Sequence, residues 1–365
     1  MRNHLCKPFA SITSLTVGAL AAAGVCAAGC SSAPKVTEAP VVLTPVTTAV
    51  PAGFEPAVPR QLTSEGESVE AYASPDGTRI LYRSEKRPLH AHPQIYEMEL
   101  ATLKERRVAF HDGEDTCPFY NPRNNKFYYS STTDEIKEDK ALDKKTSQIS
   151  ALVSTAVEDL GAELPPFEIY ESGLDGTDIE RLTVSEGYDS EVAVHPNGQT
   201  IIFSSSRTGD LELHTMDLKT KGVRRITTEP GADGGAFFSP KGRQIVWRHF
   251  APDLKESHVM VANHLGGDRR QLTTKKAIHW APFWHPSGEV IVFSSNRDES
   301  QNFELYTVDL RGLCLKRLTY STGTDTNPSF TPDGSKIIFT SNRTGKNQIY
   351  IMDYKAPAAC ADELP

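Results

Sequence analysis

Four aspartates and a histidine recur at one position relative to a series of prolines, and side chains of these types could bind basic groups. Counting seven residues back from each of six prolines gives Ser68, Asp115, Asp189, Asp233, His279 and Asp325. If the fold brings these side chains to one opening, four acids and a histidine would create a focused negative potential there. Such a potential suits a basic peptide segment, a terminal amine or a cation.

A second interpretation gives the same acids a structural role. Arginines of three S-x-R loops, Arg207, Arg297 and Arg343, should reach the same face. The aspartates could cap turns or pair with these arginines, and pairing that recurs in step with a repeat favours this interpretation. The two interpretations are compatible if some acids stay unpaired.

The segments that must position these residues repeat along the chain. Their turn prolines are Pro75, Pro122, Pro196, Pro240, Pro286 and Pro332. The spacing is 44–47 residues, except between the second and third prolines, where an insertion lengthens it. This is the period of a four-stranded propeller blade, in which the first strand lines the central channel. Each turn precedes an apolar strand such as I-I-F at residues 337–339.

The fourth strand of each repeat indicates how the ring closes. Four repeats end in a fourth strand that carries an L-T or I-T signature and leads into the next repeat. These signatures lie at residues 181–183, 225–227, 271–273 and 317–319, with a degenerate fifth at 107–109. No such strand follows Asp353, whereas R-Q-L-T at residues 60–63 precedes the first blade. We therefore predict an all-β fold, a six-bladed β-propeller of four-stranded blades closed by the N-terminal strand, which completes blade six.

The repeat resembles the TolB-type repeat of periplasmic propellers. Residues 327–353 keep its pattern best, with a T-P-D-G turn, an apolar triplet, S-N-R and I-Y-I-M-D. The resemblance covers roughly residues 60–353, although blade two lacks the turn glycine and blade four has W-R-H where other blades carry serines. It implies a rigid platform for protein interactions.

The N-terminal residues predict an export signal. Arg2 and Lys7 precede an apolar stretch at residues 12–25, which ends in A-A-G-C at residues 27–30. This ending resembles a bacterial lipobox with Cys30 as the lipidated residue, although Ala27 replaces the usual leucine; the alternative is ordinary cleavage after a small residue. Since Ser31 is not the aspartate associated with inner-membrane retention, we expect a lipid anchor in the outer membrane, facing the periplasm.

These patterns give the expected domain organisation. A lipoprotein signal peptide at 1–29 precedes a tether rich in proline, alanine and threonine at 30–59, the propeller at 60–355 and a tail at 356–365. Neighbouring blades could bring Cys314 and Cys360 together, and a disulfide would hold the tail beside the ring closure. Sequence does not fix the geometry of that bond, so both states of the pair stay open. Cys117 is then single.

An insertion at residues 132–166 interrupts blade two. Its apolar residues fall on one face of a helix: Ile149, Leu152, Val153, Ala156, Val157 and Leu160. The loop in which it lies is on the channel-entrance face. The predicted helix is therefore either a partner-binding lid or a helix docked on the ring.

The formal net charge of −8 argues against a nucleic-acid partner, which would require a basic face. The favoured function is a non-catalytic protein–protein interaction scaffold of the bacterial cell envelope. We expect a monomer that contacts the membrane only through its lipid and binds an envelope protein or peptide at the channel entrance. The predicted binding residues are Asp115, Asp189, Asp233, His279, Asp325, Arg207, Arg297 and Arg343.

Enzyme signatures are sparse: the chain contains no G-x-S-x-G, H-E-x-x-H, P-loop or C-x-x-C pattern. Oligogalacturonide lyases, which are also propellers, use channel histidines to hold a metal. A metal-dependent polysaccharide lyase is therefore the alternative function, and its candidate histidines are His249, His258, His264 and His279. The favoured function requires no catalytic residue, metal or cofactor, and the sequence does not indicate a channel Ca²⁺.

Overall fold

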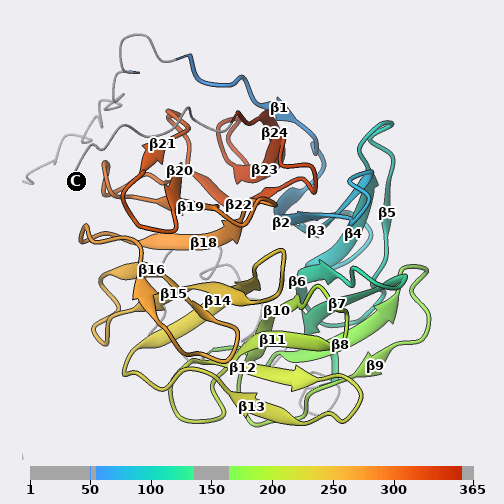
Figure 1. Cartoon of the computed structure of the whole chain (residues 1–365). Coiled ribbons are helices and arrows are strands. Elements are labelled where there is room, and N and C mark those ends of the chain that lie inside the picture. Colours follow the sequence, from blue (N-terminus) through green and yellow to red (C-terminus); the bar gives the residue numbers. More distant parts are fainter. Residues whose placement is uncertain (1–49, 51–54, 135–163, 356–365) are drawn as a thin grey trace, which may run out of the picture. The chain divides into compact units, whose positions relative to one another are not determined.

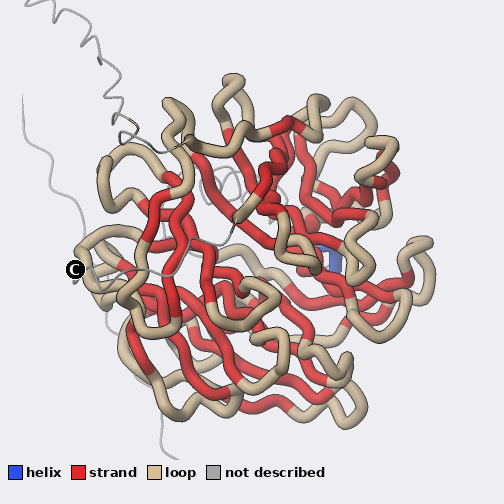
Figure 2. Tube along the Cα trace, turned by 45° about the horizontal axis from the view of Figure 1, so that its top comes forward, coloured by secondary structure: helices blue, strands red, loops and turns tan. Residues whose placement is uncertain are grey.

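The computed structural model describes Val50, residues 55–134 and residues 164–355. The chain divides into two units, Met1–Thr44 and Pro45–Pro365, and every described residue belongs to the second. This unit contains six four-stranded antiparallel sheets, each of which is one blade (Figure 1). Figure 2 shows that strands and short loops make up the described residues, apart from one helical turn at residues 133–134.

Each blade contributes one strand to each of four concentric layers. The inner strands are β2 (Glu67–Ala73), β6 (Asp115–Tyr120), β10 (Asp189–Val194), β14 (Ala232–Phe238), β18 (His279–Trp284) and β22 (Asp325–Phe330). The second strands are β3 (Arg79–Glu85), β7 (Lys126–Ser131), β11 (Thr200–Ser205), β15 (Gln244–Phe250), β19 (Val290–Ser295) and β23 (Lys336–Ser341).

The two outer layers follow in the same blade order. The third strands are β4 (Gln94–Glu99), β8 (Glu168–Gly173), β12 (Glu212–Asp217), β16 (Ser257–Asn263), β20 (Glu304–Asp309) and β24 (Gln348–Asp353). The outermost strands are β5 (Glu105–Arg107), β9 (Glu180–Arg181), β13 (Val223–Arg225), β17 (Arg270–Gln271), β21 (Lys316–Arg317) and β1 (Arg60–Gln61). Every inner strand contacts the inner strands of both neighbouring blades, so the six sheets form a closed ring.

The N-terminal strand closes the ring as the sequence predicts. β1 pairs antiparallel with β24, with Arg60 opposite Ile351, and Figure 1 shows the two strands side by side. The hydroxyl of Thr63 accepts a hydrogen bond from the Ile349 amide at 2.9 Å. Chain ends that are far apart in sequence thus share one blade, which leaves no unpaired edge at the junction.

The hydrophobic core lies between the blades and is built from the apolar triplets of the second strands. The residues at 80–82, 127–129, 201–203 and 337–339 are completely buried. Five of the six inner turns contain a glycine at φ of 69–76°, at positions 77, 198, 242, 288 and 334. Glycine adopts this left-handed conformation without the steric cost that a Cβ would impose.

Candidate functional site

The residues that lie seven before the turn prolines begin the inner strands, and we call them the seam residues: Ser68, Asp115, Asp189, Asp233, His279 and Asp325. Each of these residues is at most 1% exposed. The expectation that they form an open acidic entrance is therefore corrected: the side chains lie in the seams between the blades and are covered by protein.

Two seam aspartates pair with the arginines that the structural interpretation predicts. Arg207 Nη2 donates to Asp189 Oδ2 at 2.5 Å, and Arg343 Nη2 donates to the two oxygens of Asp325 at 2.9 and 2.7 Å. Arg297 differs, because its guanidinium lies over the ring of Tyr306 at 5.8 Å, in a blade whose seam residue is a histidine. Pairing in step with the repeat thus holds for blades three and six.

In blades four and five, the seam residues have hydrogen-bond partners other than an S-x-R arginine. Asp233 Oδ1 accepts a hydrogen bond from Trp247 Nε1 at 2.6 Å and lies 2.9 Å from His249 Nδ1. His279 Nε2 lies 3.1 Å from the carbonyl oxygen of Lys275. Burial lowers the pKa of His279 to about 4, so this imidazole is neutral at pH 7.

Asp115 in blade two is the exception among the seam acids. The S-x-R arginine is replaced there by Thr133, and neither oxygen of Asp115 has a hydrogen-bond partner among the described residues. Burial raises the pKa of Asp115 well above its usual range, and the nearby Ser131 hydroxyl offsets only part of this effect. This carboxyl is therefore favoured in its neutral form.

The seams contain a second set of buried acids that the sequence analysis missed. Glu168, Glu212 and Glu304 begin their third strands, and an arginine of the L-T signature contacts each of them, as Arg317 Nη2 contacts Glu304 Oε1 at 3.1 Å. Burial and the nearby charge of Asp325 raise the pKa of Glu304 to about 7. The recurring E-I-Y and E-L-H/Y segments are the sequence signal that could have identified these glutamates.

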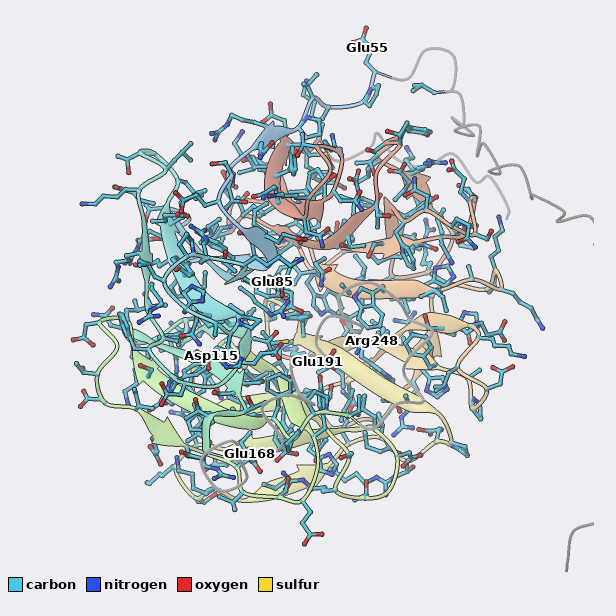
Figure 3. The ribbon with its side chains drawn as sticks, turned by 180° about the vertical axis from the view of Figure 1, so that it is seen from behind. Glu55, Glu85, Asp115, Glu168, Glu191 and Arg248 are labelled. Atoms are coloured by element: carbon cyan, nitrogen blue, oxygen red, sulfur yellow. The ribbon has the colours of Figure 1, made fainter. Side chains whose placement is uncertain are left out.

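The residues five before the turn prolines, which we call the axis residues, have a different backbone. They are Glu70, Cys117, Glu191, Gly235, Ala281 and Asn327, and each has a positive φ between 49° and 61°. The inner strand of every blade shifts its register at this point, as expected for a β-bulge. All except Gly235 are partly exposed. Figure 3 shows Glu191 close to the centre of the ring, with Asp115 and Glu168 farther out.

Four aromatic rings meet at the centre of the ring. Tyr72, Phe119, Phe237 and Phe283 occupy equivalent positions in blades one, two, four and five, and their ring centroids lie 4.8–6.0 Å apart. The axis residues, which lie two positions before these rings on the same strands, therefore adjoin an aromatic cluster at the centre of the ring. We call the axis residues and this cluster the axis site.

The two axis glutamates reach across to the next blade. Glu70 Oε2 accepts hydrogen bonds from Thr116 Oγ1 at 2.8 Å and from the Cys117 amide at 3.1 Å. Glu191 Oε2 accepts one from the Gly235 amide at 2.9 Å, and Arg248 donates to its other oxygen at 2.5 Å. Glu191 and Arg248 lie together near the centre in Figure 3. The axis site thus contains charged side chains held in place by hydrogen bonds, and a charged group of a partner could bind to them.

The histidines of the lyase alternative do not form a metal centre in the described part of the chain, where no three His, Cys, Asp or Glu side chains are close enough to hold an ion. The rings of His258 and His279 are 5.9 Å apart, and His249 contacts Asp233. His264 lies near His195 instead, with ring centroids 6.3 Å apart.

Comparison with known proteins agrees with this architecture. Residues 235–360 match the family model described as the TolB beta propeller domain. A structure from Agrobacterium tumefaciens assigned as a TolB superposes with a TM-score of 0.58 and 17% identity, over 81% of this chain and 94% of that one. The ring is a TolB-like β-propeller.

Two further similarities to this TolB-like propeller are weaker evidence, because one covers a small part of the chain and the other has low sequence identity. An uncharacterized protein of Agrobacterium fabrum is 33% identical over 88 residues, which are 24% of this chain, and the match spans less than a third of that relative. An oligogalacturonate lyase from Vibrio parahaemolyticus superposes with a TM-score of 0.51 and 14% identity, over 81% of this chain and 93% of that one. At such identities the structural likeness indicates the fold alone.

Several predictions about the segments around the TolB-like propeller lie outside the described residues. They concern the signal peptide and Cys30, most of the tether, the insertion helix and the tail with Cys360. Cys314 is disulfide-bonded, and its pairing with Cys360 stays a prediction. Among the described residues, no helix is long and apolar enough to cross a membrane.

Proposed function

We propose that this protein is a non-catalytic interaction module of the bacterial cell envelope and that it binds an envelope protein or peptide at the axis site. The TolB-like fold supports an interaction role, and the predicted lipobox at Cys30 supports an anchor in the outer membrane. The protein then acts as a monomer whose only membrane contact is its lipid. Loss of lipid labelling and of membrane association in Cys30→Ala would be the expected result for this anchor.

One observation carries the choice of the axis site. The axis residues share one backbone conformation but differ in side chain from blade to blade, and five of the six are partly exposed. The seam residues two positions earlier are buried, and most of them are bonded within the ring. A position that is structurally uniform, partly exposed and chemically varied can acquire a recognition role without weakening the ring.

The axis site is also preorganised. Its residues lie on inner strands that are paired on one side and packed against both neighbouring blades. A partner that binds there does not have to order the strands, so little conformational entropy is lost on the propeller side. This rigidity suits a platform that captures a flexible segment of another protein.

The test is photo-crosslinking in the full-length protein in its own cell. A photoreactive residue replaces Asn327, which is partly exposed at the axis, or Glu289, which is exposed after the turn at the other end of β18. We expect a discrete protein adduct from position 327 and none of the same mass from position 289. Adducts that form only at position 289, or equally at both, would contradict binding at the axis site.

A further inference from the structure

We propose that Glu70 binds a cationic side chain of the partner, a guanidinium or an ammonium group, in the way that Glu191 binds Arg248 within the ring. This inference rests on the proposed function, since it names the chemical class that the axis site recognises. It follows from a comparison of the two axis glutamates.

Glu70 and Glu191 are structural equivalents in blades one and three. Both are the bulge residue of an inner strand, with a φ of 58°. Each carboxylate accepts a hydrogen bond from the amide of the next blade's axis residue, Cys117 for Glu70 and Gly235 for Glu191. The backbone thus presents the two carboxylates to the centre of the ring in the same way.

Glu191 is neutralised within the ring. Arg248 donates to its Oε1 at 2.5 Å, and the guanidinium also lies 3.9 Å from the ring centroid of Trp280. Glycines make room for this arginine, because a Cβ at Gly234 or Gly235 would lie 2.8 or 2.3 Å from a guanidinium nitrogen. Arg248 therefore shows how an axis glutamate accommodates a guanidinium.

Glu70 has only neutral hydrogen-bond donors, namely the Thr116 hydroxyl and the Cys117 amide. It forms no ion pair with any residue that the structure describes. Arg83, from the same blade, directs Nη2 to Glu114 at 3.0 Å and to Glu85 at 3.1 Å. Arg83 also interacts electrostatically with Glu70, but its ion pairs are with Glu114 and Glu85, so the charge of Glu70 is only partly compensated within the ring.

The residue that corresponds to Arg248 in blade two is Ser130. It is completely buried, and its hydroxyl has no hydrogen-bond partner among the described residues. Ser130 stands opposite Thr116 in the β6–β7 pairing, so both hydroxyls lie on one face of the sheet, and Thr116 binds Glu70. At the position of Arg248, blade two therefore has a hydroxyl without a partner among the described residues and no arginine. A partner's cation would supply the missing charge.

The probe for this site is a blocked pentapeptide with one arginine, acetyl-Gly-Gly-Arg-Gly-Gly-amide, compared with its citrulline analogue, which has nearly the same shape and no charge. Binding to the full-length protein is followed by amide NMR shifts at low salt. We expect the arginine peptide to shift the Thr116 and Cys117 amides and the citrulline peptide to leave them unchanged. Equal shifts with both peptides would overturn the proposal.

Variants of the protein test whether the arginine side chain of the peptide binds at Glu70. Glu289→Gln is the control for the loss of one exposed negative charge. Glu70→Gln should weaken binding of the arginine peptide about tenfold, and Glu289→Gln should not. The triple change Thr116→Gly, Cys117→Gly and Ser130→Arg transfers the blade-four arrangement to blade two, because both glycines that make room for Arg248 are then present, and its new arginine should block the peptide. If Glu70→Gln and Glu289→Gln bind the peptide equally, Glu70 is not the site. A partner still crosslinked at position 327 would then leave the proposed function intact.

Discussion

The seam residues and the axis residues stand two positions apart on the same inner strands, yet their environments are opposite. The seam residues are buried, and most are bonded to other parts of the ring. The axis residues are mostly partly exposed and range from glutamate to alanine. In this ring, the polar side chains that recur with the repeat bond mainly within their own blades and fix the start of each inner strand, whereas positions that vary between blades are available for recognition.

The seam itself contains an informative contrast. Arg343 Nη2 donates to both carboxylate oxygens of Asp325, whereas Asp115 has no arginine and no hydrogen-bond partner among the described residues. Both carboxyls are completely buried. We therefore expect Asp325 to stabilise blade six and Asp115, at the equivalent position, to destabilise blade two.

The largest effect is expected for Asp325→Ala. This change removes one partner of a buried ion pair and leaves Arg343 without its carboxylate, which typically costs about 3–5 kcal/mol. Chemical denaturation would measure the loss in the free energy of unfolding. The matched control is Asn327→Gly, two residues along the same strand, where glycine adopts the φ of 49° without strain. A loss below about 1 kcal/mol for Asp325→Ala would contradict a structural role for the seam.

A pH-dependent effect is expected at Glu304. Its pKa is raised from the usual 4.5 to about 7, so the folded state holds its proton more tightly than the unfolded state does. The associated stability is present below pH 4.5 and is lost as the pH rises to about 7. Glu304→Gln lacks this loss. Relative to wild type, the variant should gain about 2 kcal/mol between pH 5 and pH 8.

Denaturation curves at several pH values would provide this measurement. A difference between wild type and Glu304→Gln that does not change with pH would show that Glu304 titrates normally in the folded protein.

Asp115→Asn should act in the opposite direction to Asp325→Ala. Because burial raises the pKa of Asp115, folding favours its neutral form, and wild type loses stability as the pH rises through the folded-state pKa. Asparagine is neutral at every pH, so the variant should be more stable than wild type, and most clearly at alkaline pH. Thermal unfolding at pH 8.5 would test this sign, and a variant that melts below wild type would indicate a stabilising partner for Asp115.

The smallest effect on stability is expected for Glu70→Gln. The glutamine oxygen can still accept the bonds from Thr116 and the Cys117 amide, and no ion pair is lost among the described residues. The free energy of unfolding should change by less than about 1 kcal/mol. A larger loss in the free energy of unfolding would indicate that Glu70 stabilises the ring and is not primarily a recognition residue.

The fold could be predicted because several features repeat together. The turn prolines, apolar triplets and L-T signatures located the blades, and R-Q-L-T at residues 60–63 identified the closing strand, which pairs with β24. The pairing of Asp189 and Asp325 with arginines was also foreseen as an alternative.

The axis site could not be predicted in the same way, because it depends on a bulge. Side chains alternate between the faces of a regular strand, and one extra residue changes which of them face the centre. The bulge at the axis residues uses left-handed backbone at Glu70 and Cys117, residue types that do not mark such a conformation. Counting from the prolines therefore gave the correct period but assigned the entrance to the seam residues.

The most direct test of the different roles of seam and axis compares partner capture by Asp115→Asn and Glu70→Gln, each carrying the photoreactive residue at position 327. Both changes replace one carboxyl group on an inner strand by an amide, and both proteins should remain folded. We predict that Asp115→Asn captures the partner as wild type does and that Glu70→Gln loses most of the adduct. Loss of the adduct in Asp115→Asn with full capture by Glu70→Gln would contradict this assignment and place recognition in the seam.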